Sequence, residues 1–332
     1  MPPRITLVHQ FDQQQSETCD LTFSQDGKRL VSSDGHALYL WQLNGDGIWS
    51  YERSLPFQNA AFLRLGPDLA FCVEEGFVKL IPLDGSEGAT FPCPPSRAWA
   101  LSPDVRWLVS NEKGQGLLLW DLVARQSFSL PLPFLGGNRN REKPELLYEP
   151  VGRFLFTPDS QQVVLFADSP EGSLHICSFA PERRSIVLKK TLPHGMIEGV
   201  ISLDGKMLAI IVPNERVYAY KQDIFVYDLE SLQLLHVFPQ MTEKLYCLLA
   251  FSPDSHYLMS CKDDGWVDIF SLDSRDCLAQ FAAHPELSSH ATDPVGGLDW
   301  SKTGYIATGG ASVFEQDMKK TDYTVKLWKV EM

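Results

Sequence analysis

The chain has 332 residues, of which 44% are hydrophobic, so it can bury a sizeable core either as two ordinary domains or as one array of repeats. Its formal net charge of −13 at pH 7 disfavours nucleic acid as a partner, because phosphate binding needs a basic face that this composition supplies at most locally. It has no run of about 18 apolar residues, and residues 1–4 lack the apolar segment of a signal peptide, so we expect a soluble, cytoplasmic protein without membrane association.

Residues 5–11 (ITLVHQF) predict a strand that stands ahead of the first repeat. In residues 21–43, Leu21 and Phe23 alternate with polar neighbours and are followed by a tight turn at 25–27. A second strand begins at Leu30, and a third runs through residues 37–43 around Trp41. The pattern predicts three antiparallel strands joined by hairpin turns. Such a unit cannot bury both of its faces alone, so repeated copies must stack against one another.

The same pattern returns along the rest of the chain, giving seven copies. In the later copies two alternating apolar residues precede a turn built from Ser, Pro, Asp or Gly, and two further strands follow. Aligned on the third strand, the copies place Trp41, Ile81, Trp120, Cys177, Tyr227, Phe270 and Trp328 at one position. The repeating unit is therefore about 40 residues long, with insertions in some copies.

A four-stranded unit of that period is typical of β-propeller blades, which pack radially so that each buries its faces on two neighbours. We therefore predict an all-β fold, with residues 1–332 forming a single domain of seven four-stranded antiparallel blades. The last copy has no sequence left for a fourth strand. We expect residues 5–11 to pair beside residues 324–330, so that the N-terminal strand closes the ring in the last blade.

The cysteines favour buried, reduced thiols. They are odd in number, scattered, mostly in strand-like context, and never spaced as Cys-x-x-Cys, which argues against a disulfide framework or a zinc site. They are Cys19, Cys72, Cys93, Cys177, Cys247, Cys261 and Cys277.

The succession of turn, strand, Asp-containing hairpin and terminal Trp-Asp resembles the WD-repeat family over nearly the whole chain. The full dipeptide is present as Trp120-Asp121, and an Asp six residues before the aromatic position is present as Asp264 and Asp322. The resemblance implies blade anchors at Trp41, Trp120, Phe270, Asp322 and Trp328. It also implies that the family's buried network is complete in the last copy, through Asp322, Trp328, Thr308 and either His284 or His290. The function that it implies is a protein-interaction scaffold.

The conspicuous residues also have structural explanations. Tryptophans at the third-strand position are expected to anchor the core between blades, since each buries a large area and needs one acceptor for its indole N–H. Aspartates recur in the first turn of each copy because their side chains can accept backbone N–H groups there. These are Asp26, Asp68, Asp104, Asp159, Asp204 and Asp254. The spacing of His284 and His290 fits no compact ligand motif, so we predict no metal and no cofactor.

Local signatures of an enzyme are missing from the sequence. It has no Gly-x-Ser-x-Gly elbow, phosphate loop, His-Glu-x-x-His motif or Cys/His cluster. We therefore expect a non-enzymatic scaffold or adaptor. Propeller hydrolases and lactonases assemble their acids from several blades around the channel, where no local motif would show. An enzyme of that type, or a small-ligand sensor at the channel mouth, is the alternative.

Loop length differs between the two faces of the predicted propeller. Turns from first to second strand and from third to fourth open on one face and are all short. Second-to-third turns and blade-to-blade links open on the other, and they include four long segments at residues 131–150, 213–222, 283–296 and 311–321. Long insertions cost little closure entropy, so their presence alone proves nothing, but four of them share one face.

These long segments mix aromatic and basic residues in a chain that is acidic elsewhere, a composition enriched in interface cores. We predict that a protein or peptide, with an acidic segment favoured, binds the face that carries them, and that the protein is otherwise a monomer. The predicted partner-binding residues are Phe134, Arg139, Arg141, Tyr148, Tyr218, Tyr220, Lys221, Phe314, Lys319 and Lys320, with Lys143 and Arg216 nearby.

Overall fold

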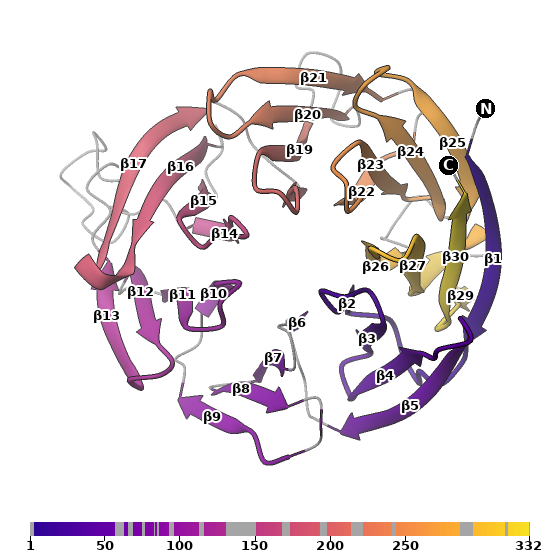
Figure 1. The fold of residues 1–332 in the computed structure, drawn as a ribbon, viewed down its shortest axis with the longest axis horizontal. Coiled ribbons are helices and arrows are strands. Elements are labelled where there is room, and N and C mark those ends of the chain that lie inside the picture. Colours follow the sequence, from indigo (N-terminus) through magenta and orange to yellow (C-terminus); the bar gives the residue numbers. More distant parts are fainter. Residues whose placement is uncertain are drawn as a thin grey trace.

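The computed structural model describes residues 3–56, 63–65, 69–74, 77–82, 84, 86–92, 96–112, 116–130, 151–167, 173–192, 198–213, 222–240, 244–285, 295–315 and 318–331. The described strands form seven four-stranded antiparallel sheets arranged as a ring, with the first strand of each sheet nearest the centre (Figure 1). The all-β, seven-bladed propeller predicted from the sequence is confirmed.

Six blades each use four consecutive strands. Blade 1 contains β2 (Asp20–Phe23), β3 (Arg29–Ser33), β4 (Ala37–Leu43) and β5 (Trp49–Pro56). Blade 2 contains β6 (Leu63–Leu65), β7 (Leu69–Glu74), β8 (Phe77–Pro82) and β9 (Ala89–Pro92). Blade 3 contains β10 (Ser96–Leu101), β11 (Trp107–Glu112), β12 (Gly116–Asp121) and β13 (Gln126–Leu130). Blade 4 contains β14 (Val151–Phe156), β15 (Gln162–Ala167), β16 (Ser173–Ala180), the 3₁₀ turn η2 (Pro181–Arg183) and β17 (Ser185–Leu192). Blade 5 contains β18 (Glu198–Ile201), β19 (Met207–Pro213), β20 (Gln222–Asp228) and β21 (Leu234–Pro239), and blade 6 contains β22 (Tyr246–Phe251), β23 (Tyr257–Lys262), β24 (Trp266–Ser271) and β25 (Cys277–Ala282).

Blade 7 joins the two ends of the chain. It contains β26 (Val295–Trp300), β27 (Tyr305–Gly310) and β30 (Val325–Glu331), and its outer strand is β1 (Arg4–Phe11). β1 runs antiparallel to β30, with Leu7 opposite Trp328 and Phe11 opposite Val325. The predicted closure is therefore confirmed. Between β27 and β30 the chain adds a separate two-stranded ribbon of β28 (Ser312–Glu315) and β29 (Met318–Thr321).

The third-strand alignment also holds in the strand register. In every blade the aligned residue lies opposite the second residue of its second strand. The pairs are Leu30 with Trp41, Ala70 with Ile81, Leu108 with Trp120, Val163 with Cys177, Leu208 with Tyr227, Leu258 with Phe270, and Ile306 with Trp328. The residues aligned on the third strand therefore occupy equivalent positions in the seven blades.

The core is divided among the interfaces between adjacent blades. Between blades 7 and 1, Trp41 is fully buried and stacks on Phe11 of β1 with ring centroids 4.7 Å apart. Between blades 6 and 7, Trp328 packs with Phe281 at 4.8 Å. Middle strands of the blades are buried on both sides, which is why they read as runs of apolar residues in the sequence. Each blade therefore depends on its two neighbours for burial.

The recurring aspartates form the same side-chain turn wherever the structure describes them. In blade 1, Ser24 Oγ donates to Asp26 Oδ1 at 2.6 Å, and the same carboxylate oxygen accepts the Lys28 N–H at 3.0 Å. Equivalent bonds are made by Asp104, Asp159, Asp204 and Asp254, which confirms their predicted role; Asp68 lies outside the described residues. These self-contained turns keep their face of the propeller compact.

Five cysteines, Cys19, Cys177, Cys247, Cys261 and Cys277, are free thiols. Cys177, Cys247 and Cys261 are buried as predicted, and burial raises the pKa of Cys177 to about 12. Cys19 and Cys277 are exposed, so the expectation of burial was wrong for them. Cys19 lies in the link that leads from β1 to β2, and Cys277 begins the outer strand β25, so neither occupies a position between blades.

Candidate partner-binding face

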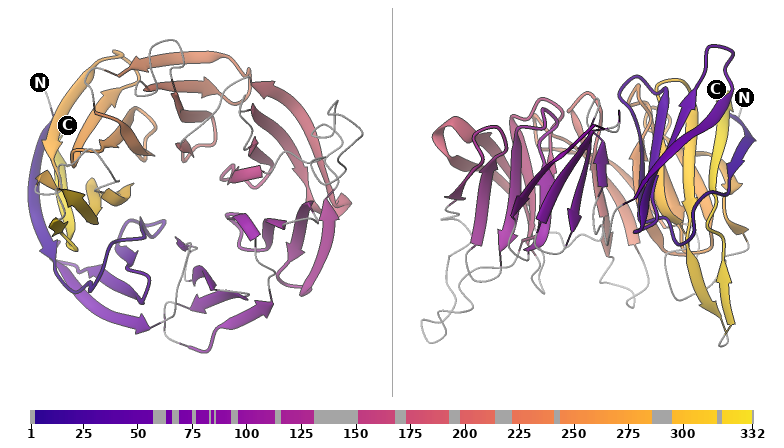
Figure 2. Two further views of the ribbon diagram at one scale, coloured as in Figure 1. Left: turned by 180° about the vertical axis from the view of Figure 1, so that it is seen from behind. Right: turned by 90° about the horizontal axis from the view of Figure 1, so that it is seen from below.

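Strand direction decides which loops share a face. Because successive strands in a blade are antiparallel, the second-to-third turns and the blade-to-blade links open together on one side of the ring, which we call the long-loop face. Its described parts include the link at 12–19, the turns at 34–36 and 263–265, and the segments 283–285 and 322–324. The β28–β29 ribbon extends the second-to-third connection of blade 7 and projects beyond the ring on this side (Figure 2, right).

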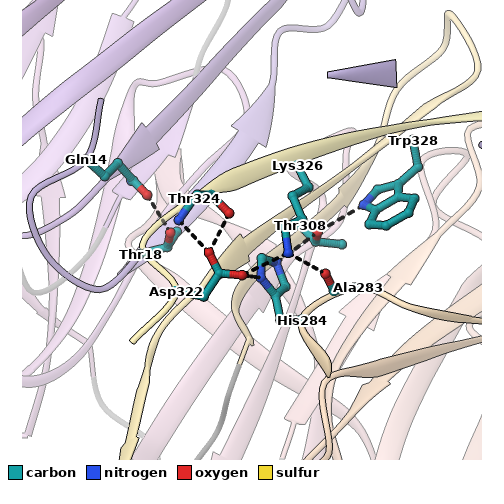
Figure 3. Close-up of polar contacts among 9 residues, drawn as sticks. All are labelled: Gln14, Thr18, Ala283, His284, Thr308, Asp322, Thr324, Lys326 and Trp328. Atoms are coloured by element: carbon teal, nitrogen blue, oxygen red, sulfur yellow. Dashed lines mark hydrogen bonds and ion pairs between the residues drawn. The ribbon is translucent and has the colours of Figure 1, made fainter. Parts of the chain in front are cut away.

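A buried polar network holds the long-loop face together at blade 7 (Figure 3). His284 is fully buried; its Nδ1 lies 2.7 Å from Asp322 Oδ2 and its Nε2 lies 3.1 Å from Thr308 Oγ1. The Trp328 indole N–H donates to the same Thr308 oxygen at 3.1 Å. The bonds are mutually satisfied when the proton of His284 is on Nδ1, since the Thr308 hydroxyl then donates to Nε2 while it accepts from Trp328. The network therefore joins the link that precedes blade 7 to β27 and β30 of that blade.

Lys326 adds a buried positive charge to this network. Its ammonium lies 2.8 Å from Asp322 Oδ2 and donates to the backbone carbonyl of Ala283 at 3.0 Å. Burial opposes ionisation of Asp322, but hydrogen bonds from His284, Lys326 and Thr324 outweigh it and hold the pKa of the carboxyl well below its usual range. Asp322 is therefore the anion on which the cation and the histidine both depend.

Blade 1 fills the equivalent space with different residues. Gln14 Nε2 donates to Ser32 Oγ at 2.9 Å, and Gln14 Oε1 accepts from Thr18 Oγ1 at 2.7 Å. Asp34 accepts from the backbone N–H of Gln15 at 2.9 Å and from the Tyr39 hydroxyl at 2.8 Å. Burial raises the pKa of Asp34, but these bonds, with those from the backbone of the turn, leave it lowered. The link at 12–19 is thus tied to the turn at 34–36.

Glycines allow the links to approach the strands this closely. A Cβ on Gly310 would lie 2.0 Å from the carbonyl oxygen of Asp322 and 2.9 Å from His284 Nδ1. One on Gly309 would lie 2.4 Å from Thr18 Cγ2, and one on Gly265 would lie 2.2 Å from the carbonyl oxygen of His284. Since real Cβ atoms do not approach other atoms this closely, side chains at these positions would displace the links.

The second-to-third turn of blade 6 is flanked by an exposed tryptophan and by a buried ion pair. Trp266 begins β24 and is 39% exposed. In the same blade, Lys262 Nζ lies 2.9 Å from Asp268 Oδ1, and both side chains are nearly inaccessible. Burial raises the pKa of Asp268 despite its bonds from Lys262 and Gln280. An aromatic ring held on such a rigid turn is a suitable anchor for a partner.

The structural anchors and the predicted contact residues are described to different extents. Trp41, Phe270 and Trp328 are buried between blades, Trp120 donates to Ser110 Oγ at 3.0 Å, and Asp322 lies in the network. The predicted partner-binding residues Phe134, Arg139, Arg141, Tyr148, Tyr218, Tyr220 and Lys221 lie outside the described residues, as does His290. Phe314, Lys319 and Lys320 lie in the β28–β29 ribbon, where the backbone alone is described.

Sequence reasoning missed several residues of this face. Asp34 stands seven residues before Trp41, one more than separates Asp264 from Phe270 and Asp322 from Trp328, so the six-residue spacing does not include it. The pairs Gly296-Gly297 and Gly309-Gly310 were visible signals of close backbone approach. The local sequence does not predict that Trp266 is exposed, because a tryptophan beside a hairpin turn is equally compatible with a buried position in the core.

The innermost strands use their charged groups to join blades. Asp299 Oδ2 of blade 7 accepts the backbone N–H of Phe23 at 2.7 Å and the Thr22 hydroxyl at 3.1 Å, both from blade 1. Arg153 of blade 4 forms an ion pair with Glu198 of blade 5. Within the described residues, no three His, Cys, Asp or Glu side chains are grouped so that they could hold a metal ion. Nor is there, in that same part of the chain, a helix long and apolar enough to span a membrane.

Comparison with known protein families gives a match to one segment of the chain. Residues 232–271 match the family described as WD domain, G-beta repeat, and this segment covers the end of blade 5 and most of blade 6. No curated protein matches the chain at a significant level. The matched repeat and the ring of four-stranded blades agree with each other, since a repeat of this family is one unit of a propeller.

Proposed function

Because this chain is a β-propeller that fits the WD-repeat family, whose members are typically non-enzymatic interaction scaffolds, we propose that it is an adaptor that binds a protein or peptide on the long-loop face. One observation carries the proposal: the two faces are built differently. The opposite face carries short, self-bonded turns such as the one at Asp26, whereas the long-loop face carries long links, a projecting ribbon and an exposed Trp266. Binding residues usually lie on loops that a rigid scaffold positions.

The contact would combine aromatic anchors with basic residues. We assign the anchors to Phe134, Tyr148, Tyr218, Tyr220 and Phe314, together with Trp266. The basic residues Arg139, Arg141, Lys221, Lys319 and Lys320 would favour an acidic or phosphorylated segment, because charge-assisted bonds from several cations fix its orientation. Affinity should therefore weaken as the salt concentration rises.

The test uses a partner captured by the intact protein and then purified. Replacing Tyr218 and Tyr220 by alanine should cost about 1 to 3 kcal/mol of binding free energy, as should Trp266→Ala, without lowering the melting temperature. Charge reversal at Arg139 and Arg141 should slow association more than it speeds dissociation. Val123→Ala is the matched control, since Val123 is 77% exposed in a third-to-fourth turn on the opposite face. Unchanged affinity in all the long-loop variants, or a loss only in the control, would contradict the proposed site.

A further inference from the structure

The outer rim of the propeller carries an unusual strand at blade 5. β21 is the last strand of its sheet, and no other described strand pairs with its outer edge (Figure 1). Three of its large apolar side chains are exposed: Leu234 at 46%, Leu235 at 37% and Val237 at 45%. Phe238 points the other way and is buried against Phe270 of blade 6, with ring centroids 4.7 Å apart. The strand is thus anchored on one side and open on the other.

Three of the other outer strands carry charged side chains that protect them against pairing with a further strand. Natural edge strands are usually blocked by charged side chains, above all lysine. β5 contains Glu52 and Arg53, β17 contains Lys189 and Lys190, and β1 contains Arg4. β21 has the sequence LLHVFP, with no lysine, arginine or carboxylate in it, and the same is true of β9, β13 and β25. Of these four uncharged strands, β21 alone exposes large apolar side chains among the described residues. It is therefore a free edge on which an extended chain can form main-chain hydrogen bonds and cover apolar side chains.

Acidic groups surround the two ends of this edge. Asp228 ends β20 and Glu230 lies in the turn that follows it. Burial and Arg275 of blade 6 lower the pKa of His236, and Asp273 of the same blade opposes them. At the far end, Asp223 lies opposite Pro239 and accepts the N–H of Gln240. Nearby cations include Lys190, which donates to the Leu232 carbonyl at 2.7 Å, and Arg275, which lies near His236. Carboxylates therefore lie near both ends of the strand.

We propose that β21 accepts an extended segment of a partner protein as a fifth strand of blade 5, and that this segment has apolar residues at alternate positions between basic ends. Alternation follows because successive side chains of an added strand point to opposite faces of the sheet. Val237 keeps the regular register opposite Phe225, and Leu235 is the extra residue of a bulge, since Val226 and Tyr227 lie opposite His236 and Leu234. Basic ends follow from the surrounding carboxylates. A second copy of this chain fits less well, because two molecules that each carry a net charge of −13 repel each other. This site on the rim is separate from the long-loop face.

The probe is a blocked decapeptide in which valine and threonine alternate between two lysines at each end. Main-chain pairing tolerates sequence, so such a peptide should bind the full-length protein, and glutamates in place of its lysines should weaken binding at least about tenfold. Hydrogen exchange at the β21 amides should slow when the lysine peptide binds. The double variant Leu235→Lys with Val237→Lys should lose binding, whereas Val187→Lys on β17, at a position 58% exposed, should keep it.

Other results would overturn the proposal. One is that the lysine peptide does not bind. Another is that the peptide slows hydrogen exchange elsewhere than in β21. A third is that the double variant and Val187→Lys bind the peptide with equal affinity. Sedimentation of the protein without peptide tests whether a second copy of the chain covers this edge. A dimer that dissociates in the Leu235→Lys variant would show that it does, and that a basic partner segment does not. Exchange mapping on the unmodified protein keeps the test valid even if the double variant fails to fold.

Discussion

At the scale of single residues, Asp322 determines the stability of the blade 7 network. It is the acceptor for both His284 and Lys326, and the ammonium of Lys326 is buried. Asp322→Asn should lower the free energy of unfolding by about 3 to 5 kcal/mol, because it leaves a buried cation without its carboxylate. Urea denaturation measures the loss. The double variant Asp322→Asn with Lys326→Met should recover part of it, and a double variant no more stable than the single one would contradict this account.

The same carboxyl predicts a pH dependence of stability. The pKa of Asp322 is lowered in the folded protein, so its contribution is fully present above the ordinary aspartate pKa of about 3.9 and is lost as the pH falls toward the folded-state value. The difference in stability between the natural protein and Asp322→Asn should therefore be large at pH 7 and shrink by pH 3. Urea titrations at both values measure it, and a difference that stays constant with pH would refute the assignment.

Gly310 allows a prediction about packing alone. Gly310→Ala places a Cβ against the carbonyl oxygen of Asp322 and against His284, so the protein should lose about 1 to 3 kcal/mol of stability through overpacking. Gly45→Ala is the control, since nothing lies within 4 Å of its Cβ position and its backbone angle is ordinary. Equal unfolding midpoints for the two variants would show that the link moves away freely.

At the scale of strands and loops, the sequence predicted the elements that repeat and missed those that do not. Third-strand positions such as Trp41 and Trp328 could be aligned because burial between two blades imposes the same apolar pattern each time. The β28–β29 ribbon was seen only as a long excursion, since its pairing has no counterpart in other blades. In β1, Val8 is an extra residue that interrupts the pairing with β30 as a β-bulge. Such bulges depend on the local twist of the sheet, and no sequence pattern predicted this one.

The candidate site was predictable to a smaller extent. Topology alone placed the long links on one face, because antiparallel strands fix the side on which each loop opens. The contacts that hold the links, such as Gln14 with Ser32 and Asp34 with Tyr39, join residues whose pairing requires knowledge of the strand register. Side-chain exposure, which singles out Trp266, is a property of the assembled ring and has no local pattern.

At the scale of the whole molecule, ring closure depends on one non-covalent strand. β1 pairs along β30 of blade 7, and its last residue, Phe11, stacks on Trp41 of blade 1, so it joins the last blade to the first. Deleting residues 1–11 would expose the edge of β30 and uncover Trp41. The melting temperature should fall by more than about 5 °C, and the shortened protein should aggregate through the open edge.

Restoring the strand as a separate peptide tests closure directly. A synthetic peptide with the sequence of residues 1–11 should raise the melting temperature of the shortened protein in a concentration-dependent way, since binding to the folded state stabilises it by mass action. The same peptide with Phe11→Ala should be much less effective, because it keeps the backbone pairing with β30 but loses the buried ring against Trp41. Differential scanning fluorimetry measures both. If the shortened protein melts with the full-length one, or if both peptides rescue equally, β1 is not the element that joins blade 7 to blade 1.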